Sequence, residues 1–135
     1  MRERVRDARV GRLATLDAEG RPQLVPFCFA LDGDVLYSAV DEKPKRSKRL
    51  KRLENIRNRP AVAVTVDHYE EDWTRLWWVQ MEGEGRVLGE GLEWERGLAL
   101  LQAKYEQYRS QPPTGPVIAI RIERWRGWSA SGRRL

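Results

Sequence analysis

The chain has few of the residues that support nucleophilic catalysis, because its 135 residues include only one cysteine and one histidine. A single cysteine excludes an internal disulfide, and the position of Cys28 in the apolar run 27–30 is typical of a small buried hydrophobic residue. No Ser-His-Asp or Cys-His arrangement can be assembled from this composition. We therefore expect any chemistry to come from a bound cofactor.

Long hydrophobic runs are also missing, and no stretch approaches the roughly 18 apolar residues that cross a bilayer as a helix. Residues 1–7 are mostly charged and lack the apolar core of a secretory signal, so we expect a cytoplasmic protein. The sequence contains no repeat and no low-complexity linker. Its length is sufficient for one hydrophobic core, which predicts a single domain over residues 1–135.

Acidic residues are scarce in one segment of the chain. Residues 43–59 contain nine Lys or Arg and one acid, Glu54, giving +8, whereas the whole chain carries +5 and the remainder therefore −3. Positive charge concentrated on a near-neutral body indicates a local binding site for an anion. Leu50, Leu53 and Ile56 recur at helical spacing, so the segment is predicted to form a helix with one packed face.

The basic residues gather at the start of this predicted helix, where the helix dipole is already positive. That arrangement is unfavourable unless a phosphate or carboxylate binds there, held by free backbone N–H groups, the Ser47 hydroxyl and the cationic side chains. Two alternatives stay open. One is a solvated charged face without a ligand, and the other is nucleic-acid binding, against which the net negative remainder of the chain argues.

Apolar and alternating runs predict six strands, joined mostly as hairpins, and two helices. The strands are expected at residues 10–17, 23–31, 35–40, 61–66, 77–88 and 116–128, and the helices at residues 45–58 and 94–108. The regular alternation of strand and helix that marks a Rossmann fold is absent. The pattern predicts a mainly β, antiparallel barrel with a helix at each opening.

Individual residues refine this prediction. Pro26 removes a backbone donor and indicates a sheet edge or a bulge, and the Asp-Gly pair at 32–33 favours a tight type I′ turn. The continuously apolar run 61–66 is typical of a central strand that is buried on both faces. Gly83 or Gly85 is expected to kink a long strand, as a closed sheet requires.

Three further patterns carry weaker signals. Residues 67–72 group His68 with four carboxylates, but the spacing is a poor metal motif, so we expect a solvated loop and no metal. Trp77 and Trp78 point to opposite faces of one strand, which allows one to pack inside and the other to meet a second subunit, although both can also belong to a monomer. The glycines of residues 83–89 resemble a dinucleotide motif only superficially, because neighbouring glutamates would repel a pyrophosphate.

Several short motifs, taken in order, resemble a known family. They are Ala14-Thr-Leu-Asp17, Gly20-Arg-Pro22, Leu24-Val-Pro26, Tyr37-Ser-Ala39, Lys43-Pro-Lys-Arg-Ser47, residues 55–60, residues 67–73 and Leu76-Trp-Trp-Val79. This order resembles the pyridoxamine 5′-phosphate oxidase-like class of flavin-binding and deazaflavin-binding split β-barrels. Residues 67–73 and 76–79 are similar to a subgroup described as coenzyme F420-dependent.

The resemblance implies a six-stranded split β-barrel that works as a homodimer, with the cofactor between the two subunits. It implies an oxidoreductase that transfers a hydride between reduced coenzyme F420 and a small organic substrate. An FMN-dependent reductase or oxidase and a non-catalytic cofactor carrier are the alternatives, and a C-terminal substrate-phosphate motif for vitamin B6 oxidation is not recognisable. The implied contacts to the cofactor's phosphate tail are Lys43, Lys45, Arg46, Ser47, Lys48 and Arg49, and those to its ring are Pro26, Phe27, Ser38, Ala39 and Trp128.

Overall fold

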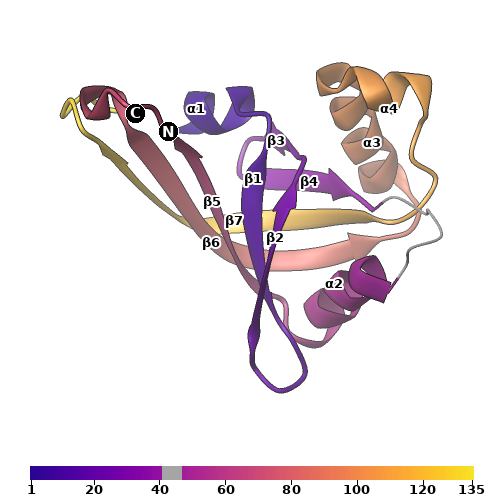
Figure 1. Cartoon of the computed structure of the whole chain (residues 1–135). Coiled ribbons are helices and arrows are strands. Elements are labelled where there is room, and N and C mark those ends of the chain that lie inside the picture. Colours follow the sequence, from indigo (N-terminus) through magenta and orange to yellow (C-terminus); the bar gives the residue numbers. More distant parts are fainter. Residues whose placement is uncertain (41–46) are drawn as a thin grey trace.

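A computed structural model describes residues 1–40 and 47–135, with only the backbone described for residues 47–50. Within these residues the chain forms one strongly curved antiparallel sheet with helices at its margins (Figure 1). The strand order is β2-β1-β5-β6-β7-β4-β3. The strands are β1 (Gly11–Leu16), β2 (Pro22–Phe27), β3 (Ala30–Asp32), β4 (Val35–Ala39), β5 (Ala61–His68), β6 (Trp77–Leu88) and β7 (Val117–Ser129). The helices are α1 (Arg2–Asp7), α2 (Ser47–Asn58), the 3-10 helix η1 (Trp73–Arg75), α3 (Leu92–Lys104) and α4 (Glu106–Ser110).

The mainly β, antiparallel fold is confirmed, but the described residues contain seven strands where six were expected. The expected strand 23–31 is two strands, because the chain changes partner at residues 28–29. β2 pairs with β1, whereas β3 pairs with β4. The backbone N–H of Phe29 donates to the side-chain hydroxyl of Tyr105, at 3.1 Å, instead of to a neighbouring strand.

The expected helix 94–108 is likewise two helices, and α1 was not expected at all. Tyr105 separates α3 from α4, since its backbone is extended (φ −115°, ψ 120°). α1 is short, and it is fixed to the sheet by Val5, which is fully buried. Its six residues contain one buried apolar side chain, so hydrophobic periodicity had too little to detect.

Local predictions about turns and strand edges have mixed outcomes. Pro26 lies in β2, which is an edge strand of the sheet, as expected. The hairpin after β3 is tight, but its loop residues are Gly33 and Asp34, because Asp32 pairs with Val35. Only Gly33 has a positive φ, +62°, so the turn has the type II′ pattern and the expected type I′ turn is wrong.

The kink expected in the long strand is a β-bulge between Glu82 and Gly83 in the pairing of β6 with β7. A Cβ atom on Gly83 would lie 1.9 Å from the carbonyl oxygen of Arg121, so only glycine permits this approach of the two backbones. The bulge bends β6 and contributes to the curvature of the sheet in Figure 1.

Strand β5 lies inside the sheet between β1 and β6, as predicted, but one of its faces is uncovered. Val62, Val64 and Val66 are buried, whereas Ala61 and Ala63 on the opposite face are exposed. The expectation of burial on both faces is therefore wrong for a single chain.

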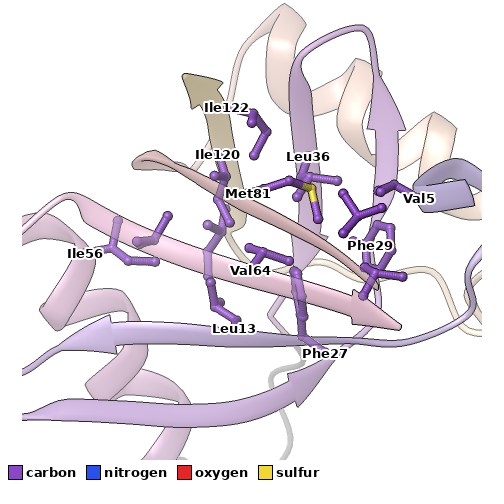
Figure 2. Close-up of a cluster of buried hydrophobic side chains, with 14 of the residues drawn as sticks. Val5, Leu13, Phe27, Phe29, Leu36, Ile56, Val64, Met81, Ile120 and Ile122 are labelled. Carbon is purple, nitrogen blue, oxygen red and sulfur yellow. The ribbon is translucent and has the colours of Figure 1, made fainter. Parts of the chain in front are cut away.

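The core fills the concave side of the sheet (Figure 2), where Leu13, Phe29, Leu36, Met81 and Ile120 are each at most 1% exposed. Leu53 and Ile56 of α2 join this core, which confirms these two positions of the predicted packed face, while the side chain of Leu50 lies outside the described part of the structure.

Helix α3 covers a second cluster, in which Leu101 packs with Tyr37 of β4 and Val117 of β7. None of the helices among the described residues has the length and apolar character needed to cross a membrane.

Candidate functional site

Four of the residues expected near a cofactor ring line one cavity. Pro26 and Phe27 lie at the end of β2, and Ser38 and Ala39 lie at the end of β4. The two strands are far apart in the sheet order, but the curvature of the sheet brings their ends together. We call this space, of about 420 Å³, the β2–β4 cavity.

Helix α2 contributes Arg52 to the same cavity, where this residue is half-buried. Arg52 lies one helical turn after Lys48, so the two residues share a face of α2. The sequence placed Arg52 in the basic run but did not select it as a cofactor contact. The spacing of four residues from Lys48 is the signal that would have selected it.

The expected phosphate contacts are only partly within the described structure. Ser47, Lys48 and Arg49 belong to the first turn of α2, and only their backbone is described. Lys43, Lys45 and Arg46 lie outside the described residues. The role of these six residues therefore stays a prediction.

The wall opposite α2 comes from α4 and the residue before it, and sequence reasoning missed it. Tyr105, Gln107 and Tyr108 line the cavity. Their spacing predicts a packed helix face, and nothing in that spacing distinguishes a residue that faces a cavity from one in the core.

The hydroxyl of Tyr105 holds the turn between β2 and β3 in place. It accepts a hydrogen bond from the backbone N–H of Phe29 at 3.1 Å. It also lies 2.9 Å from the carbonyl oxygen of Arg9 and 3.1 Å from the carbonyl oxygen of Phe29, and it can donate its hydrogen to either of them. Burial raises the pKa of Tyr105 to about 12, so this phenol is neutral at physiological pH.

Lys104 braces the same turn from the end of α3. Its Nζ donates to the carbonyl oxygen of Phe29 at 2.9 Å and lies 4.1 Å from the centroid of the Phe29 ring. Burial, and then repulsion by Arg9, lowers the pKa of Lys104 to about 8. Cys28 lines the cavity here and is half-buried, which corrects its expected place in the core.

Trp128 is not part of this cavity in the same chain. It lies near the end of β7, is 44% exposed, and stacks on Trp78 with 6.4 Å between ring centroids. Trp77, on the other face of β6, packs against the core. A contact between Trp128 and a cofactor ring therefore requires the second subunit of a dimer.

The acidic loop after β5 is organised by its own hydrogen bonds. Asp72 accepts from the backbone N–H of Thr74 at 3.1 Å and begins η1, and His68 lies 2.5 Å from Glu70. Over residues 1–40 and 47–135, no three His, Cys, Asp or Glu side chains are grouped in a way that could hold a metal ion.

The β2–β4 cavity has the character of a site for a flat aromatic group with an anionic tail. Its volume lies within the roughly 300–1,000 Å³ of small-molecule sites. Phe27, Val40 and the two tyrosines supply apolar surface, Ser38 supplies a hydroxyl, and Arg52 supplies a cation. Among the described lining residues there is no carboxylate, and the titratable side chains there are Cys28, Arg52 and the two tyrosines.

A family model described as pyridoxamine 5′-phosphate oxidase matches residues 1–129. No curated protein sequence matches the chain.

The solved structures that share the fold include the following three. A heme binding protein from Mycobacterium smegmatis has a TM-score of 0.78 at 21% identity, over 98% of this chain and 53% of that one. An FAD-binding protein from Mesorhizobium loti has a TM-score of 0.71 at 23% identity, over 93% and 89% of the two chains. An F420 reductase has a TM-score of 0.68 at 22% identity, over 92% and 94%.

At these identities the structural likeness establishes the fold alone. The family model, in contrast, covers nearly the whole chain. With its curved antiparallel sheet and the cavity between the ends of β2 and β4, the chain belongs to the pyridoxamine 5′-phosphate oxidase family of split barrels.

Proposed function

We propose that the chain is an oxidoreductase that binds coenzyme F420 in the β2–β4 cavity and transfers a hydride between the reduced cofactor and a small organic substrate. The observation that carries the proposal is the convergence of Pro26, Phe27, Ser38 and Ala39, selected from the sequence, with Arg52 of the basic helix. The likeness to an F420 reductase supports the choice of deazaflavin.

The chain's own residues would bind and orient the cofactor rather than take part in the reaction. When bound, the deazaflavin supplies the hydride chemistry. Phe27 and the tyrosines would pack against its ring and exclude water, and Ser38 would hydrogen-bond a polar ring edge. Arg52 and the basic first turn of α2 would neutralise the anionic tail.

A flavin, FMN or FAD, is the closest alternative, since the same walls accept any flat ring of that kind and one structural neighbour is described as FAD-binding. A heme is less well supported. Heme iron is commonly held by a histidine. The chain's single histidine, His68, lies at the end of β5 and is not among the residues that line the β2–β4 cavity.

A non-catalytic carrier is the alternative of a different class. In this alternative the same walls, Phe27, the tyrosines and Arg52, would hold the cofactor without a substrate beside it. Consumption of reduced F420 in the presence of candidate acceptors separates the two, because a carrier binds the cofactor without turnover.

We further propose that the functional unit is a homodimer. Ala61 and Ala63 are exposed on an interior strand of the sheet, and with Ala14 and Leu16 they line a hollow of about 690 Å³ whose rim also carries charged residues, namely Glu82, Glu84, Glu123 and Arg124. Small apolar side chains on an uncovered sheet face suit close packing against a second copy. A second copy also provides the route by which Trp128 reaches a cofactor.

The cofactor proposal is tested by titrating the purified protein with F420 and, separately, with FMN, following absorbance and fluorescence. Ala39→Leu adds bulk to the cavity wall and is expected to weaken binding at least about tenfold, or about 1.4 kcal/mol. Ala99→Leu, the same change at an exposed position of α3, is the control and should bind as the wild type does. Binding of neither cofactor, or equal binding by the two variants, would refute the proposal.

The anionic tail is tested by charge reversal in the basic segment. Lys45→Glu with Lys48→Glu is expected to weaken F420 binding by several kcal/mol at low salt. Thermal stability should stay the same or rise, because fewer cations then crowd the positive end of the helix. Arg57→Glu, an exposed position in the last turn of α2, is the control. Unchanged affinity in the double variant would remove the basic segment from the site.

The dimer is tested by light scattering after size exclusion. The wild type is expected to have twice the mass of one chain, and Ala63→Arg is expected to shift it towards the monomer, because the long side chain would occupy the hollow into which the second copy packs. Ala99→Arg should leave the mass unchanged. A monomeric wild type would contradict the proposal.

A further inference from the structure

A second cavity, of about 590 Å³, lies at the other end of the sheet. It is formed by η1, the end of β5, the start of β6 and the end of β7, close to both termini in Figure 1. None of its lining residues belongs to the β2–β4 cavity. We call it the arginine pocket, because Arg4, Arg75 and Arg133 line it.

The three arginines give the arginine pocket a net positive charge, which the terminal carboxylate of Leu135, another lining residue, offsets only in part. Among the described residues that line it, none has an acidic side chain. Glu70 is not a lining residue, but its carboxylate pairs with Arg75 at 3.2 Å and offsets the charge of that arginine. Among the described residues, Arg4 and Arg133 are in no ion pair with a carboxylate. Like charges repel when they gather around one hollow, and a bound anion would offset this repulsion.

The guanidinium groups come from segments with defined positions. Arg4 lies over the ring of Trp77, at 5.2 Å from the ring centroid. The Ser129 hydroxyl donates to the carbonyl oxygen of Arg133 at 2.8 Å, and the Arg133 N–H donates to the Ser131 hydroxyl at 3.3 Å. A hydrogen bond of 2.9 Å from Ala130 N to the carbonyl oxygen of Leu76 ties this turn to the start of β6. These contacts fix the Arg4 guanidinium and the backbone that carries Arg133, and a site with a fixed backbone loses less entropy when a ligand binds.

The chemistry of the walls defines the ligand class. Arginine forks match the planar oxygen pairs of carboxylates and phosphates, and hydroxyls such as those of Thr74 and Ser129 add neutral hydrogen bonds. Trp77 and Leu76 add an apolar surface. We propose that the arginine pocket binds a small organic anion whose phosphate or carboxylate lies between Arg4 and Arg133. This proposal does not depend on the cofactor in the β2–β4 cavity.

The test follows the indole N–H resonance of Trp77 by NMR, assigned through its loss in Trp77→Phe. The full chain is titrated with inorganic phosphate and, separately, with citrate, against sodium chloride at equal ionic strength. We expect a saturable shift with one or both anions and none with chloride. A stronger response to citrate indicates a carboxylate ligand, and a stronger response to phosphate indicates a phosphate ester. Saturation by neither anion would overturn the proposal.

Variants connect the signal to the arginines. Arg4→Gln and Arg133→Gln are each expected to weaken binding roughly tenfold, which is about 1.4 kcal/mol. Arg133→Lys, which keeps the charge but loses the fork, should fall between Arg133→Gln and the wild type. Arg12→Gln, at an exposed position of β1 outside the pocket, is the matched control. Equal affinities for Arg133→Gln and Arg12→Gln would also overturn the proposal.

The two sites are distinguished in the same experiment. Binding of phosphate to the basic segment near α2 should be lost in the double variant Lys45→Glu, Lys48→Glu. The response of the Trp77 resonance to phosphate should persist in that variant. Loss of the Trp77 response there would mean that the signal comes from the basic segment, which would refute the arginine pocket. Failure of F420 to bind would leave the Trp77 result unaffected.

Discussion

The substitution Tyr105→Phe removes one oxygen from the wall of the β2–β4 cavity and keeps the ring. In the wild type that oxygen accepts from the backbone N–H of Phe29 at 3.1 Å and lies within hydrogen-bonding distance of two carbonyl oxygens, those of Arg9 and Phe29. Phe29 itself is fully buried, so water is not expected to replace the lost acceptor. The variant thus tests one hydrogen-bonding group at the point where β2 becomes β3.

The expected cost follows from which groups lose their partners. The carbonyl oxygen of Phe29 keeps the hydrogen bond from Lys104, at 2.9 Å, so its loss is small. The N–H of Phe29 becomes a buried donor without an acceptor, and such a group costs about 1–3 kcal/mol. For a chain of 135 residues this corresponds to a fall in Tm of ~3–12 °C.

Thermal unfolding measured by circular dichroism gives the comparison, with Tyr69→Phe as the matched control. Tyr69 is 63% exposed, and its hydroxyl accepts only a long hydrogen bond of 3.4 Å from Trp73. The control should change Tm by less than about 2 °C, as surface substitutions usually do. Equal Tm values for the two variants would mean that the Tyr105 hydroxyl does not hold the turn, and the reasoning would fail.

Three further predictions concern stability. Gly83→Ala should lower the free energy of unfolding, measured with urea, by about 2 kcal/mol or more, because the new Cβ would lie 1.9 Å from the carbonyl oxygen of Arg121. Gly89→Ala is the control, since a Cβ there has no atom within 4 Å, and it should change the same free energy by less than about 0.5 kcal/mol. Asn55→Ala removes the buried hydrogen bond of 3.2 Å from Asn55 to Thr15 and should lower the free energy of unfolding by about 1–3 kcal/mol. Asn58→Ala, at the exposed end of α2, should change it little. Burial, followed by the hydrogen bond to Glu93, raises the pKa of Tyr37 from 10.0 to about 12. The folded state therefore keeps this proton after the unfolded state has lost it, so stability is full below about pH 10 and falls as pH rises towards 12. Thermal unfolding across this range should show a smaller fall in Tyr37→Phe.

The sequence predicted most of the sheet because its strands carry strong signals. The apolar run of β5 and the alternation in β7 each gave one correct strand, and Gly83 marked the bulge. The helix α2 was predicted correctly because Leu53 and Ile56 share a face that had to be buried.

The errors have a common physical cause, which is tertiary contact between distant segments. The division of the expected strand 23–31 depends on Tyr105, 76 residues after Phe29 in the sequence, and no local pattern contains that information. The sequence did not predict that one face of β5 is exposed, for a related reason. Apolar alanines satisfy the periodicity of a buried strand whether they are covered by the same chain or by a second one.

The same contacts explain why the candidate site was predicted only in part. Pro26, Ser38 and Ala39 lie in motifs that can be recognised in the sequence, and Phe27 directly follows one of them, so the sequence could select these four residues that line the cavity. Their contact with a cofactor stays a prediction. Tyr105, Gln107 and Tyr108 line the cavity from the point at which α3 ends and α4 begins. Their role depends on the break between the helices, which the periodicity of the sequence does not show.

The break between β2 and β3 and the break between α3 and α4 depend on each other. Tyr105 can reach Phe29 because its own backbone leaves the helical conformation, and Phe29 can accept this side chain because it has left the ladder of β2. Residues on both sides of the two breaks, among them Phe27, Cys28, Tyr105 and Gln107, line the cavity. The cavity is therefore built by the residues at which the regular elements end, and a variant that restores helical continuity through Tyr105 should lose cofactor binding together with this turn.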